Sequence, residues 1–292
     1  LKYDSTHGRF GLKVDVGHGA IKIDGHSVPL MNYPSSEHDF WRAQDVDLVI
    51  DCTGRELDRA AASQHLGGSV KRVLLSQPGS SDVDATIIWG LNQHVLTPSM
   101  TVVSAGSCTS NALMPILSIM DDALGINAGI VTTIHSAMND QPVIDAYHHT
   151  DLRKTRAAFN SVIPVETGLA QGVERFLPHL GEKIQARALR VPTLNVSSLD
   201  VVLAVDTATS AADVNRIIKE ASQSFSGVLS VNEEPLASCD FLGMDASCVV
   251  DITQTQVSGG QLIKLMLWFD NEWAFTNRMV DIAIAMSKFS DD

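Results

Sequence analysis

Short apolar runs separated by turn-forming residues dominate the first third of the chain. They lie at 45–50, 73–75, 86–89 and 102–104. A short apolar run bounded by turn signals is typical of a strand buried on both faces. A helical stretch from 57 to 66 and a Gly67-Gly68 break separate the first two runs. The pattern predicts alternating strands and helices in a parallel sheet with crossover connections.

The pattern changes to a helical period after Ser107. Apolar side chains fall on one helical face at Leu113, Ile116, Leu117, Met120 and Leu124, and Gly125 follows. This spacing predicts a helix that ends at the glycine. The next apolar run, 130–134, predicts a strand that delivers His135 at its end. The polar segment 136–164 after it predicts a long functional loop.

The last third of the chain predicts a second kind of sheet. Longer strand-like runs such as 199–205 accompany one amphipathic helix at 211–225. We expect a mixed or antiparallel sheet here, and a closing helix at 272–289 that packs back on the first domain. A length of 292 residues also favours two domains over one.

Composition narrows the function classes. Hydrophobic residues make up 45% of the chain, yet no stretch approaches the roughly 20 apolar residues of a bilayer-spanning helix. A net charge of −13 argues against nucleic acid or an anionic membrane as partner. Four cysteines without a CxxC pair favour a reducing, cytoplasmic compartment. We expect no metal site, because His148-His149 has no partners at ligand spacing.

Cys108 and His135 are the candidates for covalent chemistry. Cys108 lies where a loop turns into the predicted helix, between small polar residues. The positive end of a helix dipole lowers the pKa of a thiol, so we expect a reactive thiolate here. A cysteine paired with a histidine base gives the activated nucleophile of covalent catalysis. Taken singly, each residue is more often structural, a buried cysteine or a surface histidine.

Five motifs resemble the glyceraldehyde-3-phosphate dehydrogenase family and occur in family order across nearly the whole chain. They are Tyr3-Asp4-Ser5-Thr6-His7-Gly8-Arg9-Phe10, Ser107-Cys108-Thr109-Ser110-Asn111, Thr132-Thr133-Ile134-His135, Leu189-Arg190-Val191-Pro192-Thr193 and Trp268-Phe269-Asp270-Asn271-Glu272-Trp273. The stretch from His135 to Gln141, with 143–148 after it, is similar to the branch of the family that oxidises erythrose 4-phosphate. The sister branch usually has Thr where Met138 stands.

The resemblance implies NAD as cofactor, a small phosphorylated aldose as substrate, and a homotetramer whose interface uses the loop 136–164. It also implies that Cys108 attacks the aldehyde and His135 takes the thiol proton. The family positions around the substrate anions correspond to Ser107, Thr109, Thr167, Gly168 and Arg190, and Lys154 corresponds to a basic substrate contact. Asn271 corresponds to the residue that orients the nicotinamide carboxamide. Outside this resemblance, Lys154 and Arg190 could be ordinary surface ion pairs.

The expected fold is α/β. Residues 1–107 and 272–292 would form a truncated Rossmann-type parallel-sheet NAD domain, and 108–271 an α+β catalytic domain with a mixed or antiparallel sheet. The family opens with a strand, a glycine-rich turn and a helix that cradle the pyrophosphate. Here Gly17-His18-Gly19 offers only a lone G-x-G, which predicts a turn. We therefore expect the sequence to begin after the family's first βαβ unit.

Three functions compete at this stage. The first is oxidation of erythrose 4-phosphate to 4-phosphoerythronate for pyridoxal phosphate synthesis, with water releasing the product. The second is a phosphorylating glyceraldehyde 3-phosphate dehydrogenase; Gly168 favours it, because the erythrose branch often has Lys there. The third is an inactive chain that only assembles with family partners.

Overall fold

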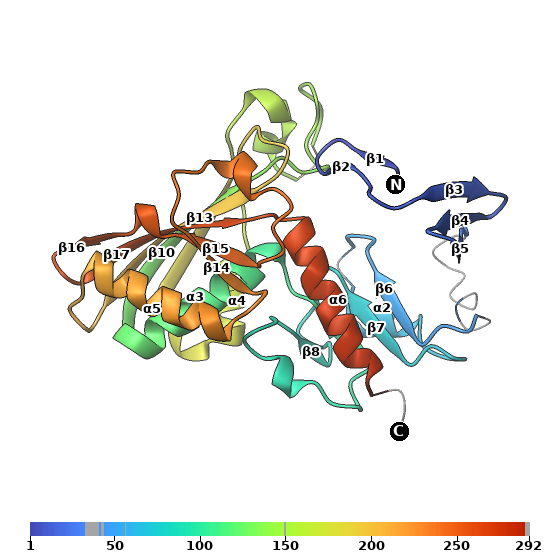
Figure 1. Ribbon diagram of the computed structural model, residues 1–292, viewed down its shortest axis with the longest axis horizontal. Coiled ribbons are helices and arrows are strands. Elements are labelled where there is room, and N and C mark those ends of the chain that lie inside the picture. Colours follow the sequence, from blue (N-terminus) through green and yellow to red (C-terminus); the bar gives the residue numbers. More distant parts are fainter. Residues whose placement is uncertain (33–40, 42–43, 56, 149, 290–292) are drawn as a thin grey trace.

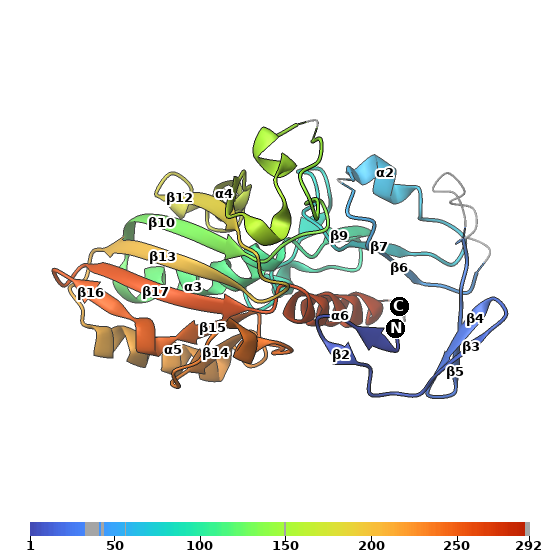
Figure 2. The same cartoon turned by 90° about the horizontal axis from the view of Figure 1, so that it is seen from above.

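A computed structural model describes residues 1–32, 41, 44–55, 57–148 and 150–289. His149, one of the two histidines considered for metal binding, lies outside the described residues. Figures 1 and 2 show a mixed sheet with three helices at one end of the molecule and a smaller parallel sheet at the other. Helix α6 (Trp273–Ser287) lies between them and packs on the parallel sheet. The architecture is α/β, as the sequence predicts.

The parallel sheet has four strands in the order β6-β7-β9-β8, and every neighbouring pair is parallel. The strands are β6 (Leu48–Asp51), β7 (Arg72–Leu75), β8 (Ala85–Thr86) and β9 (Val102–Ser104). Because successive side chains point to opposite faces, Leu74 and Val103 pack against α6, while Val73 and Val102 pack against α2 (Arg59–Ser63). The predicted parallel sheet and closing helix are confirmed. Strand β8 is shorter than the apolar run 86–89, because it ends at Thr86.

The N-terminal residues form small antiparallel sheets. Strands β1 (Tyr3–Asp4) and β2 (Gly8–Arg9) pair in one, and β3 (Val14–Gly17), β4 (Ala20–Ile23) and β5 (His26–Pro29) in another. Gly17-His18-Gly19 is the turn between β3 and β4, as predicted. Asp24 and Gly25 both have positive φ, the geometry of a tight hairpin. Two-residue turns keep these three strands antiparallel.

The larger sheet has eight strands, seven of them in the order β11-β12-β10-β13-β17-β15-β14, with β16 beside β17. The pairs β10–β12 and β14–β15 are parallel and the other pairs are antiparallel. The strands are β10 (Ile126–His135), β11 (Ile163–Val165), β12 (Ile184–Arg190), β13 (Ser197–Val205), β14 (Leu229–Asn232), β15 (Cys248–Asp251), β16 (Gln256–Ser258) and β17 (Leu262–Phe269). The predicted mixed sheet is confirmed.

Three helices cover one face of this sheet (Figure 1). They are α3 (Cys108–Leu124), α4 (Leu169–Phe176) and α5 (Ala211–Ser224). Their apolar sides form the main core with the inward-facing residues of the strands, such as Leu199, Val201 and Leu203 on β13. Gly125 ends α3 with a φ of 69°, as the sequence predicts. The helix begins at Cys108, five residues before the apolar stripe, because Ser107 caps it.

The described residues of the segment 136–162 form a loop with short 3-10 helices, and this loop projects beside the sheet (Figure 2). Among the described residues, the 3-10 helices are η1 (Gln93–Val95), η2 (Leu152–Thr155), η3 (Ala158–Asn160), η4 (Pro178–Leu180), η5 (Ser238–Phe241) and η6 (Ile252–Gln254). In the described part of the chain, none of the helices is long and apolar enough to cross a bilayer.

Candidate active site

Cys108 is the first residue of α3. The helix begins here because Ser107 has an extended backbone and its Oγ accepts a hydrogen bond from the backbone N–H of Ser110 at 3.0 Å. Asn111 Nδ2 donates to the carbonyl oxygens of Ala105 and Ser107, both at 2.9 Å, and so fixes the loop that leads to the cysteine. The thiol therefore has a defined position at the start of a helix.

His135 ends strand β10 and faces Cys108. The distance from Cys108 Sγ to His135 Nε2 is 3.7 Å. On the other side of the ring, Nδ1 lies 2.9 Å from the carbonyl oxygen of Ser136, which can only accept a hydrogen bond. The Nδ1 atom therefore carries the proton in the neutral ring, and Nε2 presents its lone pair to the sulfur. Phe269 packs edge-on against the imidazole.

Burial sets the protonation of this pair. It raises the pKa of Cys108, and this effect outweighs the hydrogen bonds from Thr109 that lower it. Burial also lowers the pKa of His135; the charge of Arg190 acts in the same direction, while the hydrogen bond to Ser136 opposes it. The expected lowered thiol pKa is wrong, because loss of solvation outweighs the hydrogen bonds that favour the thiolate. Both groups are favoured in their uncharged forms, so the thiol needs a base.

Arg190 and Lys154 meet at Asp140. Arg190 Nη1 lies 2.5 Å from Asp140 Oδ1, and Lys154 Nζ lies 3.3 Å from Oδ2. Burial would raise the pKa of Asp140, but the hydrogen bond and charge of Arg190, followed by the charge of Lys154, hold it below its usual value. The two predicted cations are thus brought together near His135, and both are ion-paired inside the chain. Sequence reasoning assigned no role to Asp140, although it lies in the motif from His135 to Gln141.

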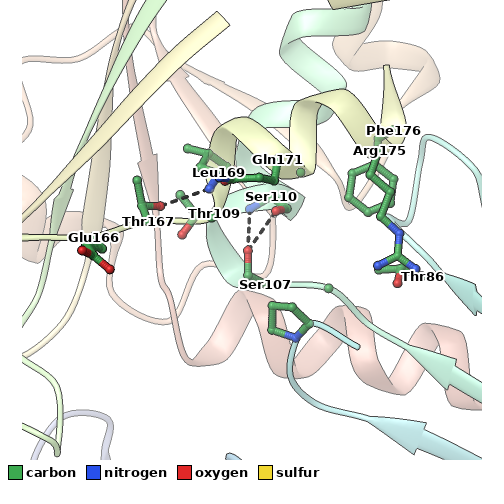
Figure 3. Close-up of a pocket in the computed structure, with 14 residues that line it drawn as sticks. Thr86, Ser107, Thr109, Ser110, Glu166, Thr167, Leu169, Gln171, Arg175 and Phe176 are labelled. Atoms are coloured by element: carbon green, nitrogen blue, oxygen red, sulfur yellow. Dashed lines mark hydrogen bonds between the residues drawn. The ribbon is translucent and has the colours of Figure 1, made fainter. Parts of the chain in front are cut away.

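Ser107, Thr109, Thr167 and Gly168 line one pocket of about 450 Å³ (Figure 3). It lies between the start of α3 and the start of α4, where Gly168 is the N-cap. Thr167 Oγ1 accepts a 3.3 Å hydrogen bond from the backbone N–H of Leu169. The first backbone N–H groups of a helix have no partners within the helix, so two adjacent helix starts suit an anionic group. The predicted anion residues on these helices therefore share one cavity.

Asn271 stands at the end of β17, just before α6. Its Oδ1 accepts hydrogen bonds from Ser197 Oγ at 2.7 Å and from Ser136 Oγ at 3.1 Å. Because both hydrogen bonds end on the oxygen, the amide nitrogen is turned to the opposite side as a donor. Ser136 follows His135 directly, so this amide lies next to the cysteine–histidine pair. Ser197 carries no local sequence signal, since only the fold brings it to Asn271.

These residues fit the nicotinamide end of a dinucleotide. An amide with a fixed oxygen can donate to a carboxamide, and the carboxyl ends of β6, β7 and β9 form the sheet edge at which open α/β folds bind ligands. Within the described ranges, Gly17 and Gly19 belong to a β-hairpin, so no glycine-rich turn there opens a helix. The described residues thus offer an amide donor that fits the nicotinamide end of such a cofactor.

Comparison with known protein families agrees with this geometry. Residues 107–271 match the model described as glyceraldehyde 3-phosphate dehydrogenase, C-terminal domain, and residues 1–59 match the NAD binding domain of the same enzyme. This pair of domains defines an NAD-dependent dehydrogenase that oxidises a phosphorylated aldehyde. Because the first match alone spans more than half of the chain, the protein belongs to the glyceraldehyde 3-phosphate dehydrogenase family. Its cofactor is NAD.

Proposed function

We propose that the protein oxidises D-erythrose 4-phosphate to 4-phosphoerythronate through a thioester on Cys108, in the route to pyridoxal 5'-phosphate. The observation that carries the chemistry is the 3.7 Å approach of Cys108 Sγ and His135 Nε2, with the proton of the imidazole held on the other nitrogen. This arrangement makes His135 the acceptor for the thiol proton.

The proposed reaction begins when Sγ of Cys108 bonds to the aldehyde carbon while the thiol proton passes to His135 Nε2 and from there to the former carbonyl oxygen, which becomes the hydroxyl of a hemithioacetal. Bound NAD supplies the acceptor for the hydride that then leaves this carbon, and Asn271 would hold the carboxamide of that acceptor. Loss of the hydride, and of the hydroxyl proton to solvent, turns the hemithioacetal into a thioester on Cys108. Water then breaks the C–S bond, which releases the acid and returns a proton to the thiolate.

Arg190 and Lys154 are the proposed cations for the substrate phosphate, with Ser107, Thr109, Thr167 and Gly168 around the second anion position. Their support is the position of both cations on Asp140 and the common pocket of the other four. A guanidinium and an ammonium can neutralise phosphate charge in a protein whose net charge is −13. The phosphate would compete with Asp140 for these two cations.

Erythrose 4-phosphate is favoured over glyceraldehyde 3-phosphate by the segment from His135 to Gln141. Met138 supplies no side-chain hydroxyl where the sister branch usually has Thr, so a phosphate would need another donor there. Gly168 instead favours glyceraldehyde 3-phosphate, since the glyceraldehyde branch has Gly at this position. A phosphorylating glyceraldehyde 3-phosphate dehydrogenase is therefore the second candidate.

We propose domains at 1–107 with 272–292, for NAD, and at 108–271, for catalysis. The packing of α6 on β7 and β9 supports joining the C-terminal helix to the first domain. A homotetramer in the cytoplasm is the proposed state, because the family typically assembles in this way and the loop 136–164 exposes apolar side chains. They include Val143, Ile144, Tyr147, Leu152 and Phe159. The four cysteines are free thiols, as a reducing compartment requires.

NADH formation from erythrose 4-phosphate tests the proposal. The full chain and a Cys108→Ser variant are assayed side by side without added phosphate, with glyceraldehyde 3-phosphate as the alternative substrate. Turnover of erythrose 4-phosphate by the parent alone supports the proposal, whereas an absolute phosphate requirement rules it out in favour of the second candidate. A parent that forms oligomers but neither binds NAD nor produces NADH would be an inactive assembly partner.

A further inference from the structure

The pocket between α3 and α4 extends well beyond the residues that the proposed reaction uses. Thr167 lies at one end and Arg175 at the other, and both line the cavity (Figure 3). Arg175 is seven positions after Gly168, the N-cap of α4, which corresponds to about 10 Å at 1.5 Å per residue. An anion at the first end would leave the Arg175 end empty.

Arg175 has no acidic partner in the described part of the chain. Its Nη1 donates a 3.1 Å hydrogen bond to the carbonyl oxygen of Gly79. No ion pair with a described carboxylate involves this arginine, and it is the one cationic residue that lines the pocket. A guanidinium has five N–H donors in a planar fork, so one hydrogen bond leaves most of them available to a ligand.

Thr86 lies at the same end and has an unsatisfied hydroxyl. The residue is only 7% exposed, its Oγ1 has no hydrogen-bond partner among the described residues, and it lines the pocket. Thr86 is the register partner of Ser104 on the neighbouring strand, and Ser104 Oγ accepts a 3.0 Å hydrogen bond from the N–H of Gly79. Ser104 therefore lies next to Thr86 across the sheet and is hydrogen-bonded to Gly79, whose carbonyl oxygen accepts the hydrogen bond from Arg175. Figure 3 shows the two side chains together.

We propose that Arg175 and Thr86 form a second anion site within this pocket that binds a phosphate group, separate from the two anion positions of the proposed reaction. A planar fork of N–H donors beside a hydroxyl matches the tetrahedral oxygens of phosphate. A buried hydroxyl without a partner carries a free-energy cost that a bound oxygen removes. The residues at the opposite end include Glu166, whose carboxylate favours placing the second anion at the Arg175 end.

Phosphate binding to the full chain, without NAD or substrate, tests this site by isothermal titration calorimetry. We expect three phosphates per chain in the parent protein, two at the anion positions of the proposed reaction and one at Arg175, and the loss of one in Arg175→Gln, with affinity at that site reduced about tenfold or more. Arg175→Lys keeps the charge but loses the fork, so it should retain weaker binding. Thr86→Val keeps the shape of the side chain and should weaken the same site by about threefold to tenfold.

Two control variants separate this site from its surroundings. Arg216→Gln removes an exposed arginine of α5 that is paired with Glu220, and Thr255→Val removes another unpartnered buried hydroxyl outside the pocket. Both should bind as many phosphates as the parent. An unchanged number of phosphates in the double variant Thr86→Val and Arg175→Gln would overturn the proposal. A single phosphate in the parent that disappears in Arg190→Gln would overturn it as well.

The test also stands apart from the proposed reaction, because it needs no turnover. A phosphate that is lost in Arg175→Gln and kept in Arg190→Gln supports the second site even if the chain fails to oxidise erythrose 4-phosphate. Glycerol 3-phosphate, which has no aldehyde, serves as the second probe. Tighter binding of this ester than of inorganic phosphate would identify a phosphorylated metabolite as the ligand, and weaker binding would identify free phosphate; either result supports a phosphate site.

Discussion

The guanidinium of Arg190 and the carboxylate of Asp140 lie 2.5 Å apart, and Arg190 is 92% buried. The carboxylate of Asp140 is thus already paired with the guanidinium that would bind the substrate phosphate in the proposed reaction. This relationship sets a competition, because a phosphate must share or displace the carboxylate. It also places a charge near His135 that does not depend on substrate.

Replacement of Asp140 by Asn should tighten anion binding. The amide keeps the shape of the side chain but removes the competing charge, so we expect inorganic phosphate to bind up to roughly tenfold more tightly, which is about 1.4 kcal/mol. The same change leaves Arg190 without its counter-charge and should lower the melting temperature. Calorimetry and thermal unfolding measure the two effects. Asp145→Asn, which breaks the exposed pair with Arg156, is the control, and unchanged or weaker phosphate binding would contradict the expectation.

Alkylation of Cys108 should become fast only in alkaline solution. Burial raises its pKa, so the thiolate that reacts with iodoacetamide forms above the roughly 8.5 of a free cysteine. The rate, followed by mass spectrometry of the peptide containing Cys108, should therefore rise steeply above pH 8. Replacing the exposed Cys52 and Cys239 by Ser removes competing sites. A rate that is already constant between pH 6 and 7 would instead indicate a thiolate–imidazolium pair.

Gly168→Lys should improve binding of an anion at the second anion position, which Gly168 lines, without distorting the chain. The glycine has a φ of −83°, which other residues adopt freely, and a Cβ atom there would meet only Gln171 Oε1, at 3.9 Å. A lysine can therefore add an ammonium group to the pocket. We expect the Kd of inorganic phosphate at this position, measured by calorimetry, to fall roughly fivefold, about 1 kcal/mol. Gly168→Met has a similar length without the charge, and an equal effect of both variants would refute the electrostatic explanation.

Asp270→Asn should make unfolding less dependent on pH in acid. Burial alone would raise the pKa of Asp270, but backbone N–H groups of Gly243 and Trp273 and the amide of Asn195 hold it below its usual value. A lowered pKa means that the stabilisation is complete above the unfolded value, about 3.9, and is lost as pH falls through the lower folded value. We expect the variant to unfold roughly 2 kcal/mol more easily at pH 6 and to approach the parent at pH 3.

Urea unfolding at the two pH values measures this difference. Asp213→Asn, at an exposed carboxylate in the first turn of α5, is the control and should shift both values little. A loss for Asp270→Asn that is the same at pH 6 and pH 3 would mean that the charge of this carboxylate does not contribute. Asp270 precedes Asn271, so NAD affinity of the variant, measured by fluorescence, also reports whether this network positions the amide.

Periodicity predicted most of the larger elements. The apolar stripe behind Ser107 fixed α3 and its end at Gly125, and the run 130–134 placed His135 at a strand end. For residues 14–29 the sequence predicted the turn at Gly17-His18-Gly19 but not the pairing of β3, β4 and β5, because most of their side chains are at least partly exposed and leave little apolar pattern. The helix predicted at 57–66 is longer than α2. Only Ala62 of α2 is buried, so the apolar pattern does not mark where this helix begins and ends.

The candidate site was predictable only in its parts. The motifs placed Cys108, His135 and Asn271, and the fold brings each to the expected region. Ser197 could not be found, since its hydrogen bond to Asn271 spans 74 positions. The predicted direction of the pKa shift of Cys108 was wrong. A helix start can be recognised in a sequence, whereas the burial that raises the pKa depends on packing from distant segments. Asp140 lies in the segment from His135 to Gln141, but its two cationic partners come from elsewhere: Lys154 from the loop after β10 and Arg190 from strand β12.

His135 and Arg190 are register partners in the parallel pair β10–β12. Their backbones are therefore held at the spacing of adjacent strands, about 4.8 Å, by main-chain hydrogen bonds that no side-chain substitution removes. In the proposed reaction, this spacing keeps the proton acceptor and the phosphate cation at a constant separation, whatever aldose is bound. Selection for a longer or shorter sugar must then act on the parts that can change shape, the loop carrying Met138 and the turn at Gly168. Enzymes of this kind that differ in substrate preference are therefore expected to differ in these loops and to remain similar in the two strands.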